Sequence, residues 1–207
     1  MTPRSKALSQ EMREQSYAKL IHAGRKLFAE KGYFNTRISD IAQEAGMSQG
    51  NVYWYFSSKE ELLKAVLADG FETLGDLMQT AAEGMGTSQG KLDNLLEGYL
   101  AFGRERGDFN AVLVSLIGHG GDELFDELGF DMAHIGLEYT LSLEKILSQG
   151  QSESALTTDT DPTILAMLFF ALFNGLNLTY GQGWLELPPD VIRDAVYRLL
   201  GMTPTKN

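Results

Sequence analysis

The sequence predicts an all-α fold, and three observations support this prediction. Apolar residues recur with the 3.6-residue period of helices in most segments. No segment shows the sustained alternation of apolar and polar residues that is typical of strands. The breaks between the expected helices carry Gly, Pro or a capping Ser, which are common helix boundaries. With 207 residues, 43% of them apolar, the chain is long enough for one large domain or two small ones.

Four helices are expected in the N-terminal part. Gly32 ends the first helix, because glycine readily adopts the backbone conformation found just after a helix. The second is short and closes at Gly46, and Ser48 is the expected N-cap of the third. Ser58 and Glu61 have the spacing of a capping box, which begins the long fourth helix. These helices are expected over residues 16–31, from Thr36 to Gly46, 48–56 and 59–82.

The C-terminal part is expected to be helical as well. A polar stretch over residues 149–161 is expected to be a loop, and Pro162 lies in the first turn of the following helix. That helix is apolar on nearly all sides from Ile164 to Tyr180, so burial on more than one side is expected. The helices are expected near 91–104, 108–119, 122–128, 130–149, 162–181 and 188–200.

The composition excludes several classes of protein. There is no cysteine, which excludes disulfide frameworks, thiolate metal sites and cysteine nucleophiles. His22, His119 and His134 have no metal-site spacing, and no P-loop, Rossmann or serine-hydrolase motif occurs. The longest apolar run has about half of the ~20 residues that a membrane helix needs, and no signal peptide is recognisable. We expect a cytoplasmic protein with no metal, no cofactor, no membrane partner and no enzymatic activity.

Charge is divided unevenly along the chain. Residues 1–68 contain ten Lys and Arg against seven Asp and Glu, whereas residues 69–207 contain seven against 21. The N-terminal part is therefore basic although the formal net charge of the whole chain is −11. Such asymmetry permits contact between the basic end and a polyanion.

The second and third helices, with the Gly-containing turn over residues 45–48 between them, form a helix-turn-helix pattern. The third helix of such a unit needs an apolar side that docks and a polar side that meets DNA. Val52 and Phe56 form an apolar pair, and at about 100° per residue another arc of the helix is left for contacts. The residues on this arc are Gln49, Gly50, Tyr53 and Trp54.

Four stretches between residues 17 and 63 agree with one known pattern at many fixed spacings. They are Ala29-Glu-Lys-Gly-Tyr33, Thr36-x-x-x-Asp40-Ile41-Ala42, Ala45-Gly46-Met47-Ser48-x-Gly50-x-Val52-Tyr53-x-Tyr55-Phe56 and Ser58-Lys59-Glu60-x-Leu62. Together they resemble the DNA-binding domain of the tetracycline-repressor (TetR) family. The resemblance implies a homodimer that binds palindromic double-stranded operator DNA. It also implies a DNA-binding domain over 1–58, a connecting helix over 59–82, and a helical ligand-binding and dimerisation domain over 83–207.

The resemblance also implies which residues meet DNA. Tyr53 and Trp54 would contact phosphate and thymine methyl groups, and Lys59 would bind a phosphate at the start of a helix. Thr36 would cap the second helix. Arg37 stands where the family often has a small hydroxyl residue, and its longer cation would reach a phosphate. The expected DNA-binding residues are Thr36, Arg37, Ser48, Gln49, Gly50, Tyr53, Trp54 and Lys59. Asn51 is expected either to pack or to contact DNA, and Arg4 and Lys6 form either an arm on DNA or a disordered tail.

The resemblance further implies that the C-terminal part holds a ligand and a second copy of the chain. The alternative for the ligand residues is that they fill an ordinary core, and the alternative for the apolar helix is the interior of a monomer. The expected ligand residues are Phe102, Phe109, His119, Phe130, His134, Phe169, Phe173 and Asn174. The expected dimerisation residues are Ala171, Gly175, Leu178 and Val196.

The sequence thus predicts a ligand-responsive transcriptional regulator, more specifically a repressor that an unknown small-molecule effector releases from DNA. One alternative is an all-α ligand-binding or enzymatic domain with a vestigial helix-turn-helix. Another is a DNA-binding protein without an effector.

Overall fold

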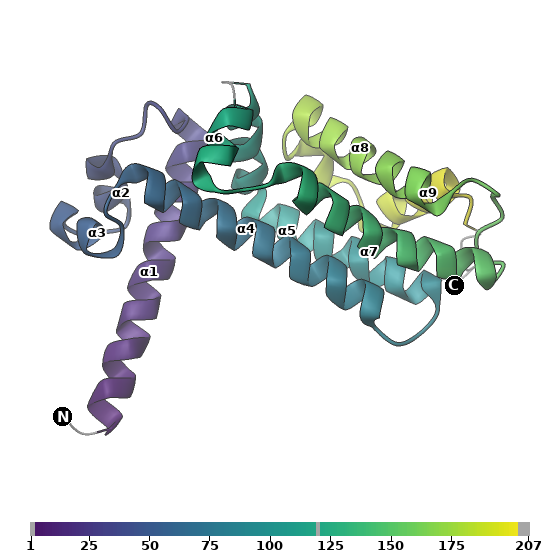
Figure 1. The fold of residues 1–207 in the computed structure, drawn as a ribbon, viewed down its shortest axis with the longest axis horizontal. Coiled ribbons are helices and arrows are strands. Elements are labelled where there is room, and N and C mark those ends of the chain that lie inside the picture. The colour runs from purple at the N-terminus through teal and green to yellow at the C-terminus, as the bar shows by residue number, and fades with distance from the viewer. Residues whose placement is uncertain (1–2, 119–120, 203–207) are drawn as a thin grey trace. The chain divides into compact units, whose positions relative to one another are not determined.

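The computed structural model describes residues 3–118 and 121–202, and its regular elements are helical (Figure 1). This confirms the predicted all-α fold. The helices are α1 (Pro3–Lys31), α2 (Ile38–Glu44), α3 (Gln49–Tyr55), α4 (Lys59–Glu83), α5 (Ser88–Ile117), α6 (Gly121–Leu128), α7 (Met132–Ser152), α8 (Pro162–Tyr180), the short 3-10 helix η1 (Gly183–Glu186) and α9 (Pro189–Leu200).

The chain divides into two compact units. The N-terminal unit comprises the described residues of 1–70 and 108–129, and the C-terminal unit those of 71–107 and 130–207. Helices α4 and α5 each contribute residues to both units. This division differs from the boundaries expected at 58 and 82, because the end of α5 and all of α6 pack with the N-terminal helices.

The N-terminal unit has a core to which each of its helices contributes. Apolar side chains from α1 to α6 are buried in it; examples are Leu20, Phe28, Ile41, Val52, Leu62, Phe109 and Phe125. Gly70 of α4 faces the ring of Phe109, and a Cβ atom at this position would overlap that ring. A glycine is therefore needed where α4 passes the Phe109 ring of α5.

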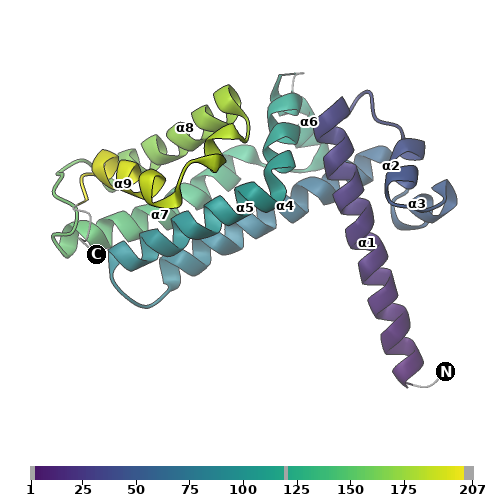
Figure 2. The same ribbon diagram turned by 180° about the vertical axis from the view of Figure 1, so that it is seen from behind.

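Helix α1 begins at Pro3, 13 residues before the expected start at Ser16. Figures 1 and 2 show its N-terminal half extending beyond α2 and α3. The side chains of residues 10–15 are all exposed. This part of the helix therefore lacks the apolar stripe on which the sequence prediction relied.

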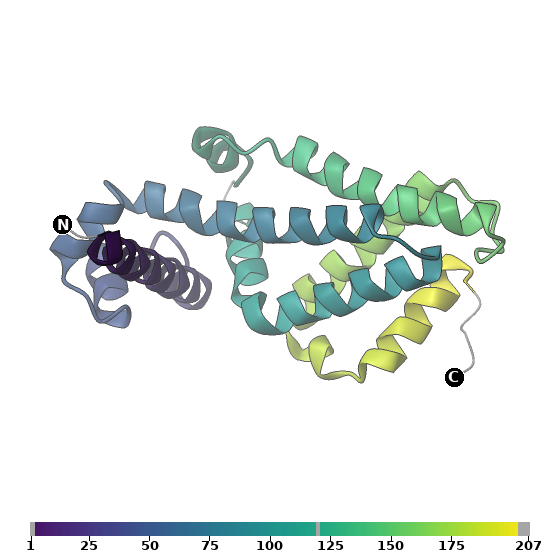
Figure 3. The same cartoon turned by 90° about the horizontal axis from the view of Figure 1, so that it is seen from below.

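In the C-terminal unit, α7 packs against α8 (Figure 3). Its core includes Leu143, Phe173 and Tyr197, whose phenol donates a 2.6 Å hydrogen bond to Asp93 of α5. Burial and the Asp93 carboxylate both raise the pKa of Tyr197. The break expected between 104 and 108 is present as a kink within α5, where Arg106 leaves helical geometry (φ −133°, ψ 27°) and separates two helical stretches.

Candidate DNA-binding site

Helices α2 and α3 and the turn between them form a helix-turn-helix. Gly46 adopts φ +66° in the turn, a left-handed conformation that favours glycine. Ser48 is the N-cap of α3, and its hydroxyl accepts a hydrogen bond from the backbone N–H of Asn51 (3.2 Å). This bond satisfies a free donor of the first turn and fixes where α3 begins.

The side chains of α3 divide sharply between the core and solvent. Val52 and Phe56 are 0% and 2% exposed and dock the helix on the unit. Tyr53 and Trp54, by contrast, are 53% and 63% exposed. These two neighbouring aromatic side chains thus form an exposed patch on the part of α3 that does not dock.

The residues at the start of α3 are exposed as well: Ser48, which is the N-cap, and Gln49 and Gly50, which belong to the expected contact arc. A Cβ atom built on Gly50 would meet only the Ser48 hydroxyl, at 3.9 Å. The surface beside Gly50 is therefore open, so another molecule can approach the backbone closely there. Asn51, for which two roles were left open, is exposed as well.

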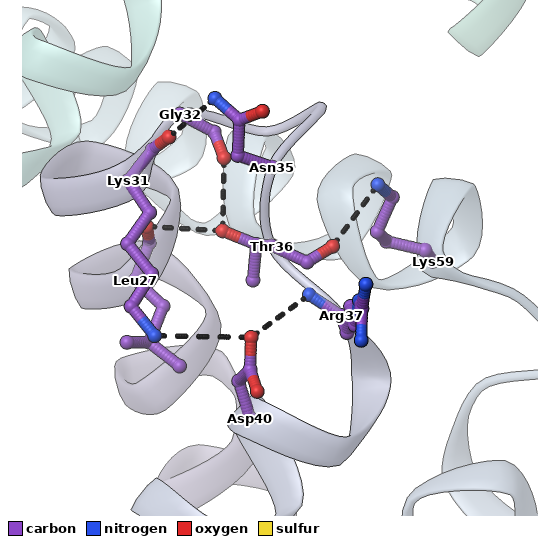
Figure 4. A network of polar contacts seen from close by, with 8 residues as sticks. All are labelled: Leu27, Lys31, Gly32, Asn35, Thr36, Arg37, Asp40 and Lys59. Atoms are coloured by element: carbon purple, nitrogen blue, oxygen red, sulfur yellow. Dashed lines mark hydrogen bonds and ion pairs between the residues drawn. The ribbon is translucent and has the colours of Figure 1, made fainter.

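Thr36 lies inside the unit and not on its surface. Its side chain is buried, and its hydroxyl lies 3.1 Å from the carbonyl oxygen of Leu27 and 2.8 Å from that of Gly32 (Figure 4). The expectation that Thr36 caps α2 is wrong, because the N-cap of α2 is Arg37. Thr36 instead satisfies carbonyl groups at the end of α1, a role that leaves its hydroxyl no path to DNA.

Lys59 also takes a role that the sequence did not indicate. Its ammonium group donates to the carbonyl oxygens of Tyr33 (2.9 Å), Phe34 (3.5 Å) and Thr36 (3.1 Å). It also lies 4.3 Å from the centre of the Tyr33 ring. Figure 4 shows the bond from Lys59 to Thr36. All three ammonium protons thus have acceptors inside the unit, and Lys59 fixes the α1–α2 loop instead of presenting its charge outward.

Arg37 is exposed at the start of α2, where its backbone N–H donates to the Asp40 carboxylate (3.3 Å). The same carboxylate lies 3.7 Å from the ammonium of Lys31 (Figure 4). The carboxylate therefore provides a cap for α2, while the guanidinium of Arg37 stays on the outer side of the helix-turn-helix.

The residues expected to bind a ligand are not gathered in one place. Phe109 belongs to the N-terminal unit, His119 lies outside the described residues, and His134 is exposed beside Glu138 (3.3 Å). Phe102, Phe169 and Phe173 are buried in the C-terminal unit, Phe130 is half-buried against Phe71, and Asn174 is exposed. The ring of Phe173 packs on Tyr99, Phe169 and Trp184 at centroid distances of 4.9, 4.7 and 5.4 Å.

The C-terminal unit also has a hollow of about 540 Å³ between α4 and α7. Phe71, Ile135 and Tyr139 form its apolar part, and acidic side chains such as Glu72 and Asp76 stand at its edge. None of the expected ligand residues that the structure describes lines this hollow.

Of the residues expected at a dimer contact, Ala171, Gly175 and Leu178 are exposed on α8. A Cβ atom on Gly175 would meet nothing within 4 Å. Val196 of α9 is 3% exposed, because it packs into the core of its own unit. It therefore offers no surface to a second chain in this structure.

Residues 20–66 match the family described as "Bacterial regulatory proteins, tetR family". The matched segment contains α2, α3 and the turn between them, which are the elements that present Tyr53 and Trp54. The helix-turn-helix segment of this chain therefore matches the tetR family of bacterial regulatory proteins.

Two relatives among known proteins are named as regulators. This chain is 36% identical over 95 residues to the "Probable HTH-type transcriptional regulator ArpR" of Pseudomonas putida, and the match covers 46% of this chain and 41% of that protein. It is 24% identical over 160 residues to the "Fatty acid metabolism regulator protein" of Bacillus subtilis (strain 168), covering 77% and 80%. The first of these matches therefore spans less than half of the relative's length.

Among solved structures, this chain is similar to the transcriptional regulator FadR from Bacillus subtilis in complex with stearoyl-CoA. The TM-score is 0.69 at 21% identity, and the match covers 89% of this chain and 97% of that one. At this identity the comparison shows that the two proteins share a fold.

Proposed function

We propose that this regulator is a homodimeric repressor that inserts α3 into the major groove of a palindromic operator. The observation that carries the proposal is the exposure of Tyr53 and Trp54 on a helix whose other side is docked by Val52 and Phe56. We assign the contacts with base edges to Gln49 and Gly50, which lie at the N-terminal end of α3. Arg37 supplies a phosphate contact from the start of α2.

Dimerisation through α8 is supported by an apolar stripe on that helix. Ile164, Leu168 and Leu178 are 50%, 59% and 69% exposed, and the small residues Ala171 and Gly175 lie between them. These positions recur about every turn, so they share one face, opposite the buried Leu165, Phe169 and Phe173. An apolar surface of this kind on a helix marks a contact with another molecule.

By length and composition alone, α8 is also the one helix among the described residues that meets the requirements for crossing a membrane. One side of α8 packs into the C-terminal unit, however, and includes the buried Leu165 and Phe173. A second copy of α8 accounts for the other side, and Ala171 and Gly175 permit close approach of the two backbones. A protein that regulates transcription works where the genome is, so we propose a cytoplasmic location. Binding to DNA requires no catalytic activity.

The proposed effector is a small molecule that favours the conformation with lower affinity for DNA. Support comes from the kinds of protein that are similar to this chain, one of which is named for fatty acid metabolism and one of which was solved with stearoyl-CoA. Raising the population of that conformation from 1% to 99% requires the effector to bind it more tightly than the other conformation by about 5.5 kcal/mol.

DNA binding is tested with the duplex that the unmodified chain selects from a randomised library. Tyr53→Ala and Trp54→Ala are each expected to weaken binding by about tenfold or more, because each loses a contact worth about 1–3 kcal/mol. Fluorescence anisotropy of the labelled duplex measures the affinity. Met85→Ala is the matched control, since Met85 is fully exposed in the other unit. The proposal is rejected if the unmodified chain selects no duplex, or if the unmodified chain and the three variants all bind the duplex with equal affinity.

The effector is tested by thermal unfolding of the chain in the presence of a panel of lipophilic compounds. A true effector at about 100 times its Kd adds about 2.7 kcal/mol and is expected to raise Tm by roughly 5–10 °C. The same compound is expected to release the selected duplex. A panel that includes fatty acyl compounds and leaves both Tm and DNA binding unchanged supports the alternative of a regulator without an effector.

A further inference from the structure

The extended N-terminal half of α1 is attached to the recognition helix α3. The ring of Tyr17 lies 5.3 Å from that of Phe56 and 6.4 Å from that of Tyr55, measured between centroids. The phenol of Tyr55 also lies 3.4 Å from the carbonyl oxygen of Arg13, to which it donates. These contacts hold the segment around residues 13–17 beside the end of α3.

Arg13 is the cation that this attachment brings to α3. Its guanidinium carbon lies 4.8 Å from the centre of the Trp54 ring, and the side chains of both residues are exposed. A guanidinium that stacks by its flat face keeps the N–H groups on its edge available for another partner. Arg13 and Trp54 also border a shallow hollow of about 270 Å³, together with Gln10, Glu14 and Tyr17.

Four other cations of the N-terminal unit have partners inside it. The committed cations and their partners are Arg25 with Asp108, Lys26 with Glu44, Lys31 with Asp40, and Lys59 with backbone carbonyl groups. Among the described residues, no carboxylate lies within ion-pair distance of Arg13. The nearby Glu14 accepts a hydrogen bond from Gln10 (2.8 Å).

We propose that Arg13 is a DNA contact supplied by α1, and that its guanidinium, stacked on Trp54, binds a backbone phosphate beside the groove that α3 enters. This inference rests on the proposed function, and it adds a third element to the DNA-binding surface. Trp54 orients the guanidinium, whose edge donors then match the geometry of a phosphate. Because a phosphate contact carries no sequence information, Arg13 contributes to affinity and not to the choice of operator.

The test compares the salt dependence of binding between the unmodified chain and Arg13→Gln, from about 50 mM to 200 mM salt. The labelled duplex is the one that the unmodified chain selects from a randomised library, with a random duplex of equal length for comparison. Arg13→Gln is expected to weaken binding to both duplexes by about tenfold at the lower salt concentration. It is also expected to reduce the slope of log K against log salt by about 0.9, the value for one phosphate.

Two further variants separate this role from others. Lys145→Gln removes the same charge from an exposed position in the C-terminal unit and is expected to leave the slope unchanged. Arg13→Lys keeps the charge and is expected to keep the slope, although it loses the flat stacking surface. If the unmodified chain binds DNA and Arg13→Gln shows the same slope as the unmodified chain, this inference is overturned and the proposed function is not. An unmodified chain that selects no duplex overturns the proposed function together with it.

Discussion

Replacing Arg25 with alanine is expected to lower the free energy of unfolding of the N-terminal unit by about 3 kcal/mol. Arg25 is 6% exposed, and its Nε donates a 2.6 Å hydrogen bond to the Asp108 carboxylate. A second nitrogen lies 3.6 Å from the Asp69 carboxylate. Arg25 thereby ties α1 to both α4 and α5. The expected loss lies at the lower end of the range for buried pairs, because the side chain of Asp108 is 23% exposed and keeps some contact with water.

Urea unfolding followed by circular dichroism measures this effect, and hydrogen exchange of peptides from α1 assigns it to the N-terminal unit. Arg25→Met keeps most of the apolar stem, so it is expected to lose nearly as much stability as Arg25→Ala because Asp108 still lacks its partner. The pair Arg25→Met with Asp108→Leu removes both charges and is expected to recover most of the loss. Lys26→Ala, which breaks only the exposed pair with Glu44, is the control and is expected to have a much smaller effect. Equal effects of Arg25→Ala and Lys26→Ala would contradict this account of the pair.

The sequence was sufficient to predict α3 and its two sides. Ser48 provides the cap, and the spacing of Val52 and Phe56 fixes which side docks. Tyr53 and Trp54 then point outward by helix geometry alone. Local patterns of this kind are readable because capping and burial act over a few residues.

Interactions between distant residues were not readable in the same way. Arg25 and Asp108 are 83 positions apart, and nothing near Arg25 in the sequence marks it as buried. Lys59 has the position of a phosphate ligand in the sequence, but its ammonium is bound to carbonyl groups of a loop 23–26 residues earlier. Backbone carbonyls carry no sequence signal, so only the fold reveals such a partner.

The start of α4 shows how local predictions can still differ in detail. Ser58 accepts from the backbone N–H of Glu61 (3.1 Å), as the expected capping box requires. The Glu61 carboxylate, however, accepts from the N–H and hydroxyl of Ser57 (2.6 and 2.7 Å) and not from Ser58. These bonds to Ser57 hold the pKa of Glu61 below its usual value. Two adjacent serines offer nearly equivalent donors, and the sequence pattern cannot distinguish between them.

Replacing both Leu168 and Leu178 with aspartate is expected to convert the proposed dimer into monomers. Each leucine contributes about 1.5–3 kcal/mol when fully buried, and each occurs twice in a symmetric contact. The dissociation constant of the dimer is therefore expected to rise by at least about a thousandfold. Sedimentation velocity across a range of protein concentrations measures it directly. Because the two side chains are 59% and 69% exposed in the single chain, the helical circular dichroism of the variant is expected to stay unchanged.

Leu137→Asp provides the control for this experiment, since Leu137 is 54% exposed on α7 and lies outside the α8 stripe. A monomer presents one recognition helix, whereas a palindromic operator offers two half-sites about one turn of DNA apart. The double variant is therefore expected to lose most of its affinity for the selected duplex while Tyr53 and Trp54 stay intact. An unmodified chain that sediments as a monomer at every concentration would contradict the contact through α8. If Leu137→Asp dissociates the dimer and the double variant does not, the contact belongs to α7.

The α8 stripe is thereby part of the proposed DNA-binding mechanism. Two weak half-site contacts become one strong contact only when the two recognition helices are linked in a dimer.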